Sequence, residues 1–295
     1  MNKAIVLHVI WILTALQVHA QEDLMDILEA EAPEEAVDEV GSTFKGTRLI
    51  NGHTVETRDR GVLVFIISHR FGRVNNGLED LFGLDFANIR LGLDYSITDK
   101  FTIGVGRSSF NKVYDGFLKY QFLTQNSRIP VTVTALGSVA RRTDPIDFEQ
   151  GVFRNAYTGQ LLIGRKFGSR LSIQVSPTVV HRNFVFLEDE VNTLATVGLG
   201  GRYKITNRLT FNVEYFPILN QGRVADGQDR QLIYDAFSVG VDIETGGHVF
   251  QLHFTNAQQM QERGFIGETS GNFWNGDIHF GFNITRAFQL VKPKM

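Results

Sequence analysis

The chain has 295 residues, 43% of them hydrophobic, with 29 glycines, 24 phenylalanines, only 6 prolines and a formal net charge of −3. It contains no cysteine, which excludes disulfides, thiolate metal sites and cysteine nucleophiles. Its basic residues are not clustered, so the sequence does not indicate a nucleic-acid-binding protein. Beyond the first 20 residues, no stretch has the ~18 consecutive apolar residues of a transmembrane helix.

Residues 1–20 have the features of a secretory signal peptide. Lys3 provides a short positive region, an apolar stretch follows from Ala4 to Leu16, and Val18-His19-Ala20 forms a small-residue cleavage site. We therefore expect an exported protein whose mature chain begins at Gln21.

Residues 21–42 are predicted to be an acidic, flexible periplasmic leader. Positions 22–39 contain nine acidic residues and no basic residue, a composition typical of disorder. An alternative is that residues 22–40 dock a periplasmic partner, because Leu24, Ile27 and Leu28 have helical spacing.

Residues 43–60 are more hydrophobic and include the turn-forming pair Asn51-Gly52. An Asn-Gly pair favours a tight hairpin turn. We expect this segment to be a small hairpin that enters or caps the rest of the protein as a plug.

Residues 88–109 show the pattern that dominates the remainder of the chain. Ile89, Leu91 and Leu93 share one face of a strand, and Arg90 and Asp94 share the other, since side chains alternate along a strand. Repetition of this pattern predicts twelve strands, near 61–71, 88–97, 101–109, 113–123, 129–139, 156–167, 171–181, 193–205, 209–217, 232–244, 248–256 and 273–288.

The connections between these strands alternate between short turns and, with one exception, long loops. This alternation is typical of outer-membrane barrels, which have short periplasmic turns and longer external loops. The sequence thus predicts an all-β protein, a transmembrane antiparallel up-and-down β-barrel of about 12 strands over residues 61–295. An even number of strands places both termini in the periplasm of a Gram-negative bacterium.

The outward-facing residues fit a lipid bilayer. Aromatic residues such as Tyr95, Phe101 and Phe71 fall near the strand ends, whereas mid-strand positions such as Leu91 and Val175 are mostly aliphatic. Two aromatic girdles around an aliphatic belt are what a membrane barrel requires.

The inward-facing residues are polar or glycine, which indicates a hydrophilic lumen. The charged positions and the histidine expected to line it are Arg90, Asp94, Asp115, Lys119, Arg202, Glu214, Asp242, Asp277 and His279. The alternative is a closed interior in which these charges pair across the lumen. Because both signs are present, the sequence does not predict strong ion selectivity.

No catalytic, cofactor or metal site is predicted, although two candidates were weighed. His69 and His181 lie on the outward face and could serve a membrane-embedded lipid-modifying enzyme, but no serine is clearly paired with either. His253, Asp277 and His279 could approach one another as metal ligands. Histidines at such positions more often have an ordinary structural role, for example as amphipathic anchors at the membrane interface, than a catalytic or metal-binding one.

Several motifs resemble a known family. They are Thr43-Phe44-Lys45-Gly46-Thr47-Arg48, Ser68-His69-Arg70-Phe71-Gly72, Leu81-Phe82-Gly83-Leu84-Asp85 and Tyr114-Asp115-Gly116-Phe117-Leu118-Lys119-Tyr120. The resemblance is to a Bacteroidota outer-membrane β-barrel family catalogued as domain of unknown function 5777. It implies an outer-membrane barrel and supplies no activity or ligand. It also draws attention to Leu81, Phe82, Leu84 and Asp85, which we expect to fold inward as a constriction loop.

The function predicted from the sequence is a passive pore or uptake channel for small polar solutes. The expected partners are the lipid bilayer, the barrel-assembly machinery and a periplasmic protein bound through residues 22–40. The first alternative is a non-conducting barrel that docks such a partner, and the second is the lipid-modifying enzyme.

Overall fold

The computed structural model describes residues 42–145, 151–185, 190–220, 233–245 and 248–291. All of these belong to one compact unit, residues 39–295. The predicted signal peptide (1–20) and the acidic leader up to residue 41, including the 22–40 docking segment, lie outside the described residues.

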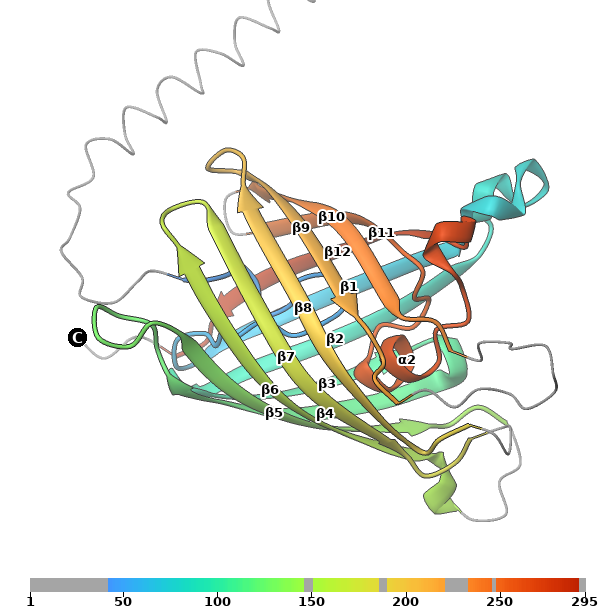
Figure 1. Ribbon diagram of the computed structural model, residues 1–295, viewed down its shortest axis with the longest axis horizontal. Helices are drawn as coiled ribbons and strands as arrows, with labels where there is room; N and C mark the ends of the chain where they lie inside the picture. Colours follow the sequence, from blue (N-terminus) through green and yellow to red (C-terminus); the bar gives the residue numbers. More distant parts are fainter. Residues whose placement is uncertain (1–41, 146–150, 186–189, 221–232, 246–247, 292–295) are drawn as a thin grey trace, which may run out of the picture. The chain divides into compact units, whose positions relative to one another are not determined.

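Twelve antiparallel strands form a closed barrel in which each strand pairs with its neighbours in sequence and β1 pairs with β12 (Figure 1). The predicted fold class is therefore confirmed. The strands are β1 Val62–Arg73, β2 Ala87–Thr98, β3 Phe101–Ser108, β4 Val113–Leu123, β5 Thr132–Arg142, β6 Asn155–Phe167, β7 Leu171–Arg182, β8 Thr193–Lys204, β9 Leu209–Phe216, β10 Ala236–Thr245, β11 His248–Thr255 and β12 His279–Gln289.

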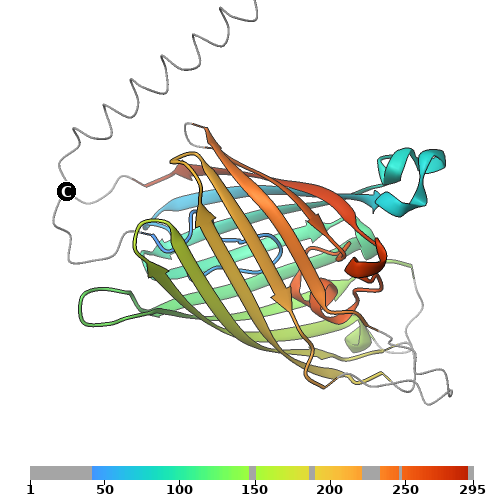
Figure 2. The ribbon, with the colours of Figure 1, turned by 45° about the horizontal axis from the view of Figure 1, so that its top comes forward.

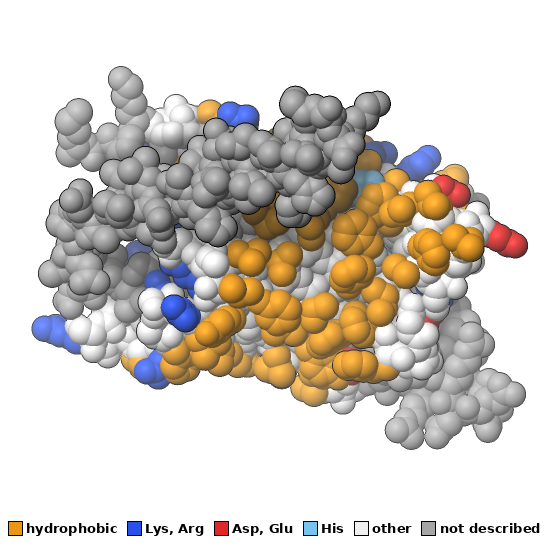
Figure 3. Space-filling view, turned by 90° about the horizontal axis from the view of Figure 1, so that it is seen from above, with side chains coloured by type: hydrophobic (Ala, Val, Ile, Leu, Met, Phe, Trp, Pro, Cys, Tyr) orange, Lys and Arg blue, Asp and Glu red, His pale blue; other side chains and the backbone are white. Residues whose placement is uncertain are grey.

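Burial alternates residue by residue along the strands, most regularly in β7, where exposed and buried positions follow each other over its full length. The exposed positions are apolar, for example Leu91, Val105 and Leu161. Figure 3 shows apolar side chains gathered over a broad area of the one face of the barrel that it presents. An apolar exterior of this kind is stable in lipid rather than in water.

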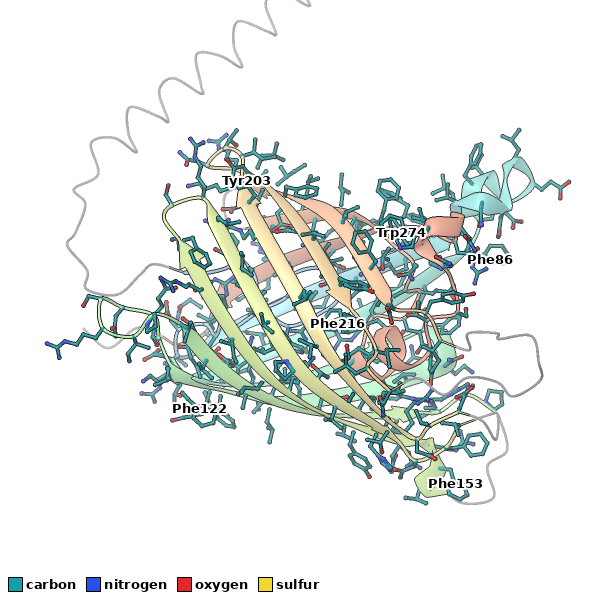
Figure 4. The ribbon with its side chains drawn as sticks, in the orientation of Figure 1. Phe86, Phe122, Phe153, Tyr203, Phe216 and Trp274 are labelled. Atoms are coloured by element: carbon teal, nitrogen blue, oxygen red, sulfur yellow. The ribbon has the colours of Figure 1, made fainter. Side chains whose placement is uncertain are left out.

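Aromatic side chains lie near both ends of this outer surface (Figure 4). Phe122 and Tyr203 are exposed near the short turns, and Trp274 is exposed near the long loops. In contrast, Phe216 points inward and is buried.

The five connections predicted to be short lie at one end of the barrel, where β1 begins and β12 ends, and the others lie at the opposite end. This arrangement follows from an even number of strands. Length does not separate the two groups fully, since the β4–β5 connection (124–131) is longer than the β3–β4 connection (109–112) at the opposite end.

Three predicted strand starts are wrong. One is that of β10, which begins at Ala236 rather than 232. β5 begins at Thr132 rather than 129, because Asn126 forms a turn with Ile129 and Pro130 has no N–H for strand pairing.

β12 begins at His279 rather than 273, because residues 273–275 form a short 3-10 helix, η5 (Phe273–Asn275). Asn272 caps η5 through Trp274 N, and Gly276 ends it with a left-handed backbone, φ 85°. Asp277, predicted to lie in the strand, is instead in this loop.

None of the helices in the described residues has the length and apolarity needed to span a bilayer. The α-helix, α2 (Glu262–Gly267), lies in the connection between β11 and β12, and all six of its residues are buried. Figure 2 shows this connection turning into the end of the barrel.

The connection between β1 and β2 does not enter the barrel, so the expected constriction at Leu81, Phe82, Leu84 and Asp85 is wrong. These four side chains are exposed, and the loop, which contains η1 (Val74–Asn76) and η2 (Leu78–Gly83), extends away from the barrel end (Figure 1). Gly83 packs directly on the Gly72 backbone, where a Cβ would lie 2.5 Å from a backbone atom. This contact holds the loop at the rim.

Asp277 links the β1–β2 connection to the β11–β12 connection at this end of the barrel. Its carboxylate accepts hydrogen bonds from Asn75 Nδ2 at 3.0 Å and from Asn272 N at 2.9 Å, and it pairs with Arg73 at 3.3 Å. The Asn75 bond is the largest of the effects that hold the pKa of Asp277 below its ordinary value of 3.8.

We predict that acid loosens this junction. Because the pKa is lower in the folded state, Asp277 stabilises the fold above pH ~3.8 and this contribution is lost as the pH falls through the folded-state pKa. Trp274 fluorescence, measured in a Trp11→Phe background, should change in that range. Asp277→Asn should give the altered signal already at neutral pH, whereas Asp85→Asn should leave the titration unchanged. An identical titration in Asp277→Asn would contradict the assignment.

Candidate functional site: the occupied lumen

Residues 43–57, which we call the plug, lie inside the barrel. Within the plug, Leu49 N donates to Gly52 O at 2.9 Å and Thr54 N donates to Thr47 O at 3.1 Å. The chain therefore reverses at Ile50 and Asn51. A hairpin forms here as predicted, but its turn is one residue before the Asn51-Gly52 pair, and neither residue of the pair has a positive φ. Leu49 to Val55 are all buried, so the plug is surrounded by the barrel wall.

Glu214 on β9 holds the tip of the plug. Its carboxylate accepts three backbone N–H groups, from Ile50 at 3.1 Å, Asn51 at 2.8 Å and Gly52 at 3.2 Å. Hydrogen bonds to a charged acceptor are stronger than neutral ones. The side chain of Glu214 is thus paired with peptide groups of the plug.

Asn51 is bound on the opposite side by polar wall residues. Its amide nitrogen donates to Ser238 Oγ at 2.9 Å, and its amide oxygen accepts from Arg70 Nη2 at 2.8 Å. Nearby, Asn283 Nδ2 donates to Ile50 O at 3.0 Å and Gln251 Nε2 donates to Leu49 O. Both N–H groups and carbonyl groups of the plug tip are therefore hydrogen-bonded to the wall.

We call the two segments of the plug on either side of its tip, residues 43–48 and 53–57, its legs. Both are bound further along the lumen. Gln174 Nε2 donates to His53 O at 2.8 Å, and Thr134 Oγ1 donates to Val55 O at 2.8 Å. The ammonium group of Lys119 donates to Glu56 O. On the other leg, Arg48 pairs with Asp94 at 3.2 Å.

A small apolar cluster completes the fit between plug and wall. Phe44, Leu49 and Val55 pack with Leu162 of β6. Glycines of the inward face make room for them. A Cβ on Gly164 would lie 2.9 Å from the Val55 methyl carbons, and one on Gly200 would lie 2.8 Å from Leu49 Cδ2.

A second segment enters the lumen from the opposite end. It is residues 256–271, which include α2 and which we call the inner loop. Phe265 and Ile266 form an apolar core with Val180, Phe216 and neighbouring alanines. The inner loop narrows the lumen at the end where the constriction was expected from residues 81–85.

The inner loop is also hydrogen-bonded to the wall at both sides of the barrel. Arg182 Nη1 donates to Gly267 O at 2.6 Å, and Asn88 Nδ2 donates to Gln258 O at 2.9 Å. It meets the plug where His53 Nε2 lies 3.2 Å from Glu262 Oε1. Together the two segments fill the lumen from its two ends.

The predicted lumen-lining residues divide into groups. Asp94, Lys119 and Glu214 bind the plug directly, as described above. Asp242 contacts the plug indirectly, because it accepts a hydrogen bond at 2.7 Å from Gln251 Nε2, which also donates to the plug. All four side chains are buried.

Within the described part of the chain, none of the other predicted lining residues forms a hydrogen bond with the plug. Arg90 and Asp115 form a two-pronged ion pair within the wall. Arg202 donates to Thr210 Oγ1 at 3.3 Å. His279 Nδ1 lies 2.8 Å from Phe71 O near the rim, and Asp277 is in the loop beyond β12.

The two outward histidines do not form a serine–histidine pair within the described ranges. His69 stacks on Phe282 at 4.9 Å, and its Nδ1 has no hydrogen-bond partner there. His181 Nδ1 is 2.8 Å from the hydroxyl of Thr193. Likewise, among these residues no three His, Cys, Asp or Glu side chains are grouped as a metal site requires.

Several residues of the site were not identified as such from the sequence. They are the plug residues Phe44, Leu49, Asn51 and Val55 and the inner-loop residues Glu262 and Phe265. For the inner loop, the run Asn256-Ala-Gln-Gln-Met-Gln-Glu-Arg is a usable signal, because amide side chains can satisfy backbone groups in a buried loop.

The comparisons with known proteins address the family. The sequence profile described as "Membrane bound beta barrel domain (DUF5777)" matches residues 44–288. The chain belongs to this family. The match extends from the plug to the last strand, so the plug is part of the DUF5777 domain. No curated protein matches the chain.

Several solved structures are weakly similar to this DUF5777 chain. The NanC porin has 10% identity and a TM-score of 0.48, covering 77% of this chain and 100% of its own. An outer membrane channel from Pseudomonas putida F1 has 14% identity and a TM-score of 0.45, and the match covers 79% of this chain and 98% of the channel. An active-site mutant of outer membrane phospholipase A from Escherichia coli has 11% identity and a TM-score of 0.43, and the match covers 83% of this chain and 97% of the phospholipase. At these values the likeness carries no functional argument.

We predict that Glu214→Gln loosens the plug without unfolding the barrel. The amide loses the charge and offers a single acceptor to three N–H groups, and a hydrogen bond to a charged group is worth about 1.5–3 kcal/mol. Hydrogen exchange at residues 49–53 should then accelerate about 10-fold or more, with exchange in the strands unchanged. Glu79→Gln, in the exposed β1–β2 loop, is the matched control. Equal protection in Glu214→Gln and the parent would count against this role.

We also predict that Gly164→Leu expels the plug leg. The new side chain would overlap Val55, and overpacking costs about 1–3 kcal/mol. Trypsin should cleave after Arg48 faster than in the parent protein. Gly159→Leu is the control, because a Cβ there meets nothing within 4 Å and its position faces outward. Cleavage at the parent rate in Gly164→Leu would show that the lumen has room to spare.

Proposed function

We propose that this protein is a gated channel of the bacterial outer membrane that passes small polar solutes, with its short turns in the periplasm. The alternation of short turns and long loops supports this orientation. The polar lumen supports the solute class. A passive pore that is permanently open does not fit the described state, because the plug occupies the lumen.

The observation that carries the proposal is the chemistry of the contact between plug and wall. Glu214, Gln174, Thr134 and Asn283 hold the plug through hydrogen bonds that water can replace. Each such bond contributes only about 0.5–1.5 kcal/mol net. Withdrawal of the plug would therefore leave a wall of polar groups suited to water and solutes.

The connection of the plug also favours movement. Residues 58–61 join it to β1, and the twelve strands pair with each other without using any plug residue. The plug can therefore leave without breaking the barrel. Exposing Phe44, Leu49 and Val55 would cost about 1.5–3 kcal/mol for each fully buried side chain, so we expect the closed state to dominate and openings to be brief.

The test is to fix the plug to the wall in the otherwise cysteine-free chain. Asn51→Cys/Ser238→Cys places two thiols where the native side chains are 2.9 Å apart, close enough for a short bifunctional thiol crosslinker. In planar bilayers we expect brief conductance steps from the uncrosslinked protein and their loss after crosslinking, with recovery when a cleavable crosslinker is reduced.

Ser96→Cys/Thr102→Cys is the matched control, since these lumen-facing side chains are 3.0 Å apart on β2 and β3 and do not belong to the plug. Crosslinking there should leave the steps intact. If neither the parent nor Glu214→Gln conducts, although both migrate as folded barrels in unheated gels, the channel proposal is wrong and the non-conducting barrel is favoured.

A further inference from the structure

The barrel wall binds the plug largely through the plug's peptide backbone. At the tip, Glu214 accepts three successive N–H groups, while Gln251 and Asn283 donate to the carbonyls of Leu49 and Ile50. These contacts use groups that every peptide has, whatever its side chains. The backbone of the tip is thus recognised through groups that any peptide offers, and the Asn51 side chain adds contacts that depend on sequence.

The same holds at the legs of the plug. Five side chains of three strands donate to plug carbonyls: Gln174 and Ser172 of β7, Thr134 of β5, and Lys119 and Gln121 of β4. The accepting carbonyls belong to Thr43, His53, Val55 and Glu56. Backbone-directed donors therefore lie on one side of the lumen, on β4, β5 and β7.

Recognition of the plug side chains is polar at Asn51 and Arg48, which bind Ser238, Arg70 and Asp94, and apolar at Leu49 and Val55. Leu49 and Val55 lie against Gly200 and Gly164, where the wall offers space rather than a polar partner. The Leu162 side chain completes this apolar surface. Such a surface accepts apolar side chains of different shapes, whereas a sugar would leave its hydroxyl groups there without partners.

We propose that the inner wall is a peptide-binding site and that the plug is its intramolecular occupant. The solutes of the proposed channel are then short peptides, which compete with residues 43–57 for the same wall groups. This inference rests on the proposed function, since a peptide must reach the lumen to compete.

The tether sets the concentration at which a free peptide competes. A segment held by a short flexible linker has an effective concentration of about millimolar. A free peptide that makes the same contacts must therefore be present at about millimolar concentration to displace the plug by half. Peptides with more apolar side chains should need less.

The experiment uses the full chain with a single cysteine at Ile50→Cys, a position that is buried in the plug tip. In detergent, the rate at which a small thiol reagent modifies this cysteine reports plug withdrawal. We expect a synthetic 43–57 peptide, and a scrambled peptide of the same composition, each to accelerate modification at least 5-fold and saturably. A malto-oligosaccharide of similar mass should have no effect.

Two controls separate peptide recognition from general loosening. A cysteine at the exposed Ser169 should react at one rate with or without peptide. A peptide N-methylated at the residues equivalent to 50–52 lacks the N–H groups that Glu214 accepts, and it should lose its effect.

Three results would overturn the inference. They are acceleration by the 43–57 peptide but not by the scrambled one, equal acceleration by the saccharide, and no acceleration by any peptide. In the last case, conductance steps that the 51–238 crosslink abolishes would show that the channel proposal survives and only the peptide assignment fails.

Discussion

A polypeptide that enters a closed barrel leaves water behind, so each of its N–H and C=O groups needs a partner inside. The strands meet this requirement by pairing with each other around the ring. The plug makes only a short hairpin of its own, with an isolated bridge between Arg48 and His53. Its remaining peptide groups depend on wall side chains, and this dependence explains why Glu214, Gln251 and Gln174 occupy inward positions.

The same requirement explains the unequal sizes of the inward residues. Some wall positions beside the plug have a polar side chain that reaches a peptide group, and others are glycines that leave room for a plug side chain. Gln174 and Gly200 are partners across β7 and β8; one donates to His53 O and the other makes room for Leu49. Alternation along each strand then leaves the opposite face free to be apolar, so occupation of the lumen and burial in lipid do not compete for the same residues.

The sequence was sufficient to predict features that depend on local periodicity. Alternation at Ile89 to Asp94 predicts strands with two unlike faces, and Asn51-Gly52 predicts a reversal of the chain. It was not sufficient to identify which long loop turns inward. Leu81, Phe82 and Leu84 are apolar, yet they remain outside because the inner loop already occupies that end of the lumen. Such competition between segments that are far apart in sequence cannot be seen in either segment alone. The start of β12 was missed for a related reason, since Asp277 bonds to Asn75 of a different loop.

The two segments inside the barrel differ in how readily each can leave. The inner loop is attached at both ends, to β11 and β12, and its α2 residues Phe265 and Ile266 belong to the apolar core with Val180 and Phe216. The plug is attached to the wall strands only through β1, and its apolar cluster includes one wall residue, Leu162, whereas that of the inner loop includes three, Val180, Phe216 and Ala236. Regions with few apolar contacts open at the lowest free energy. Movement of the lumen contents should therefore begin with the plug, at the His53–Glu262 contact where it separates from the inner loop, while the inner loop stays in place and sets the width of the path.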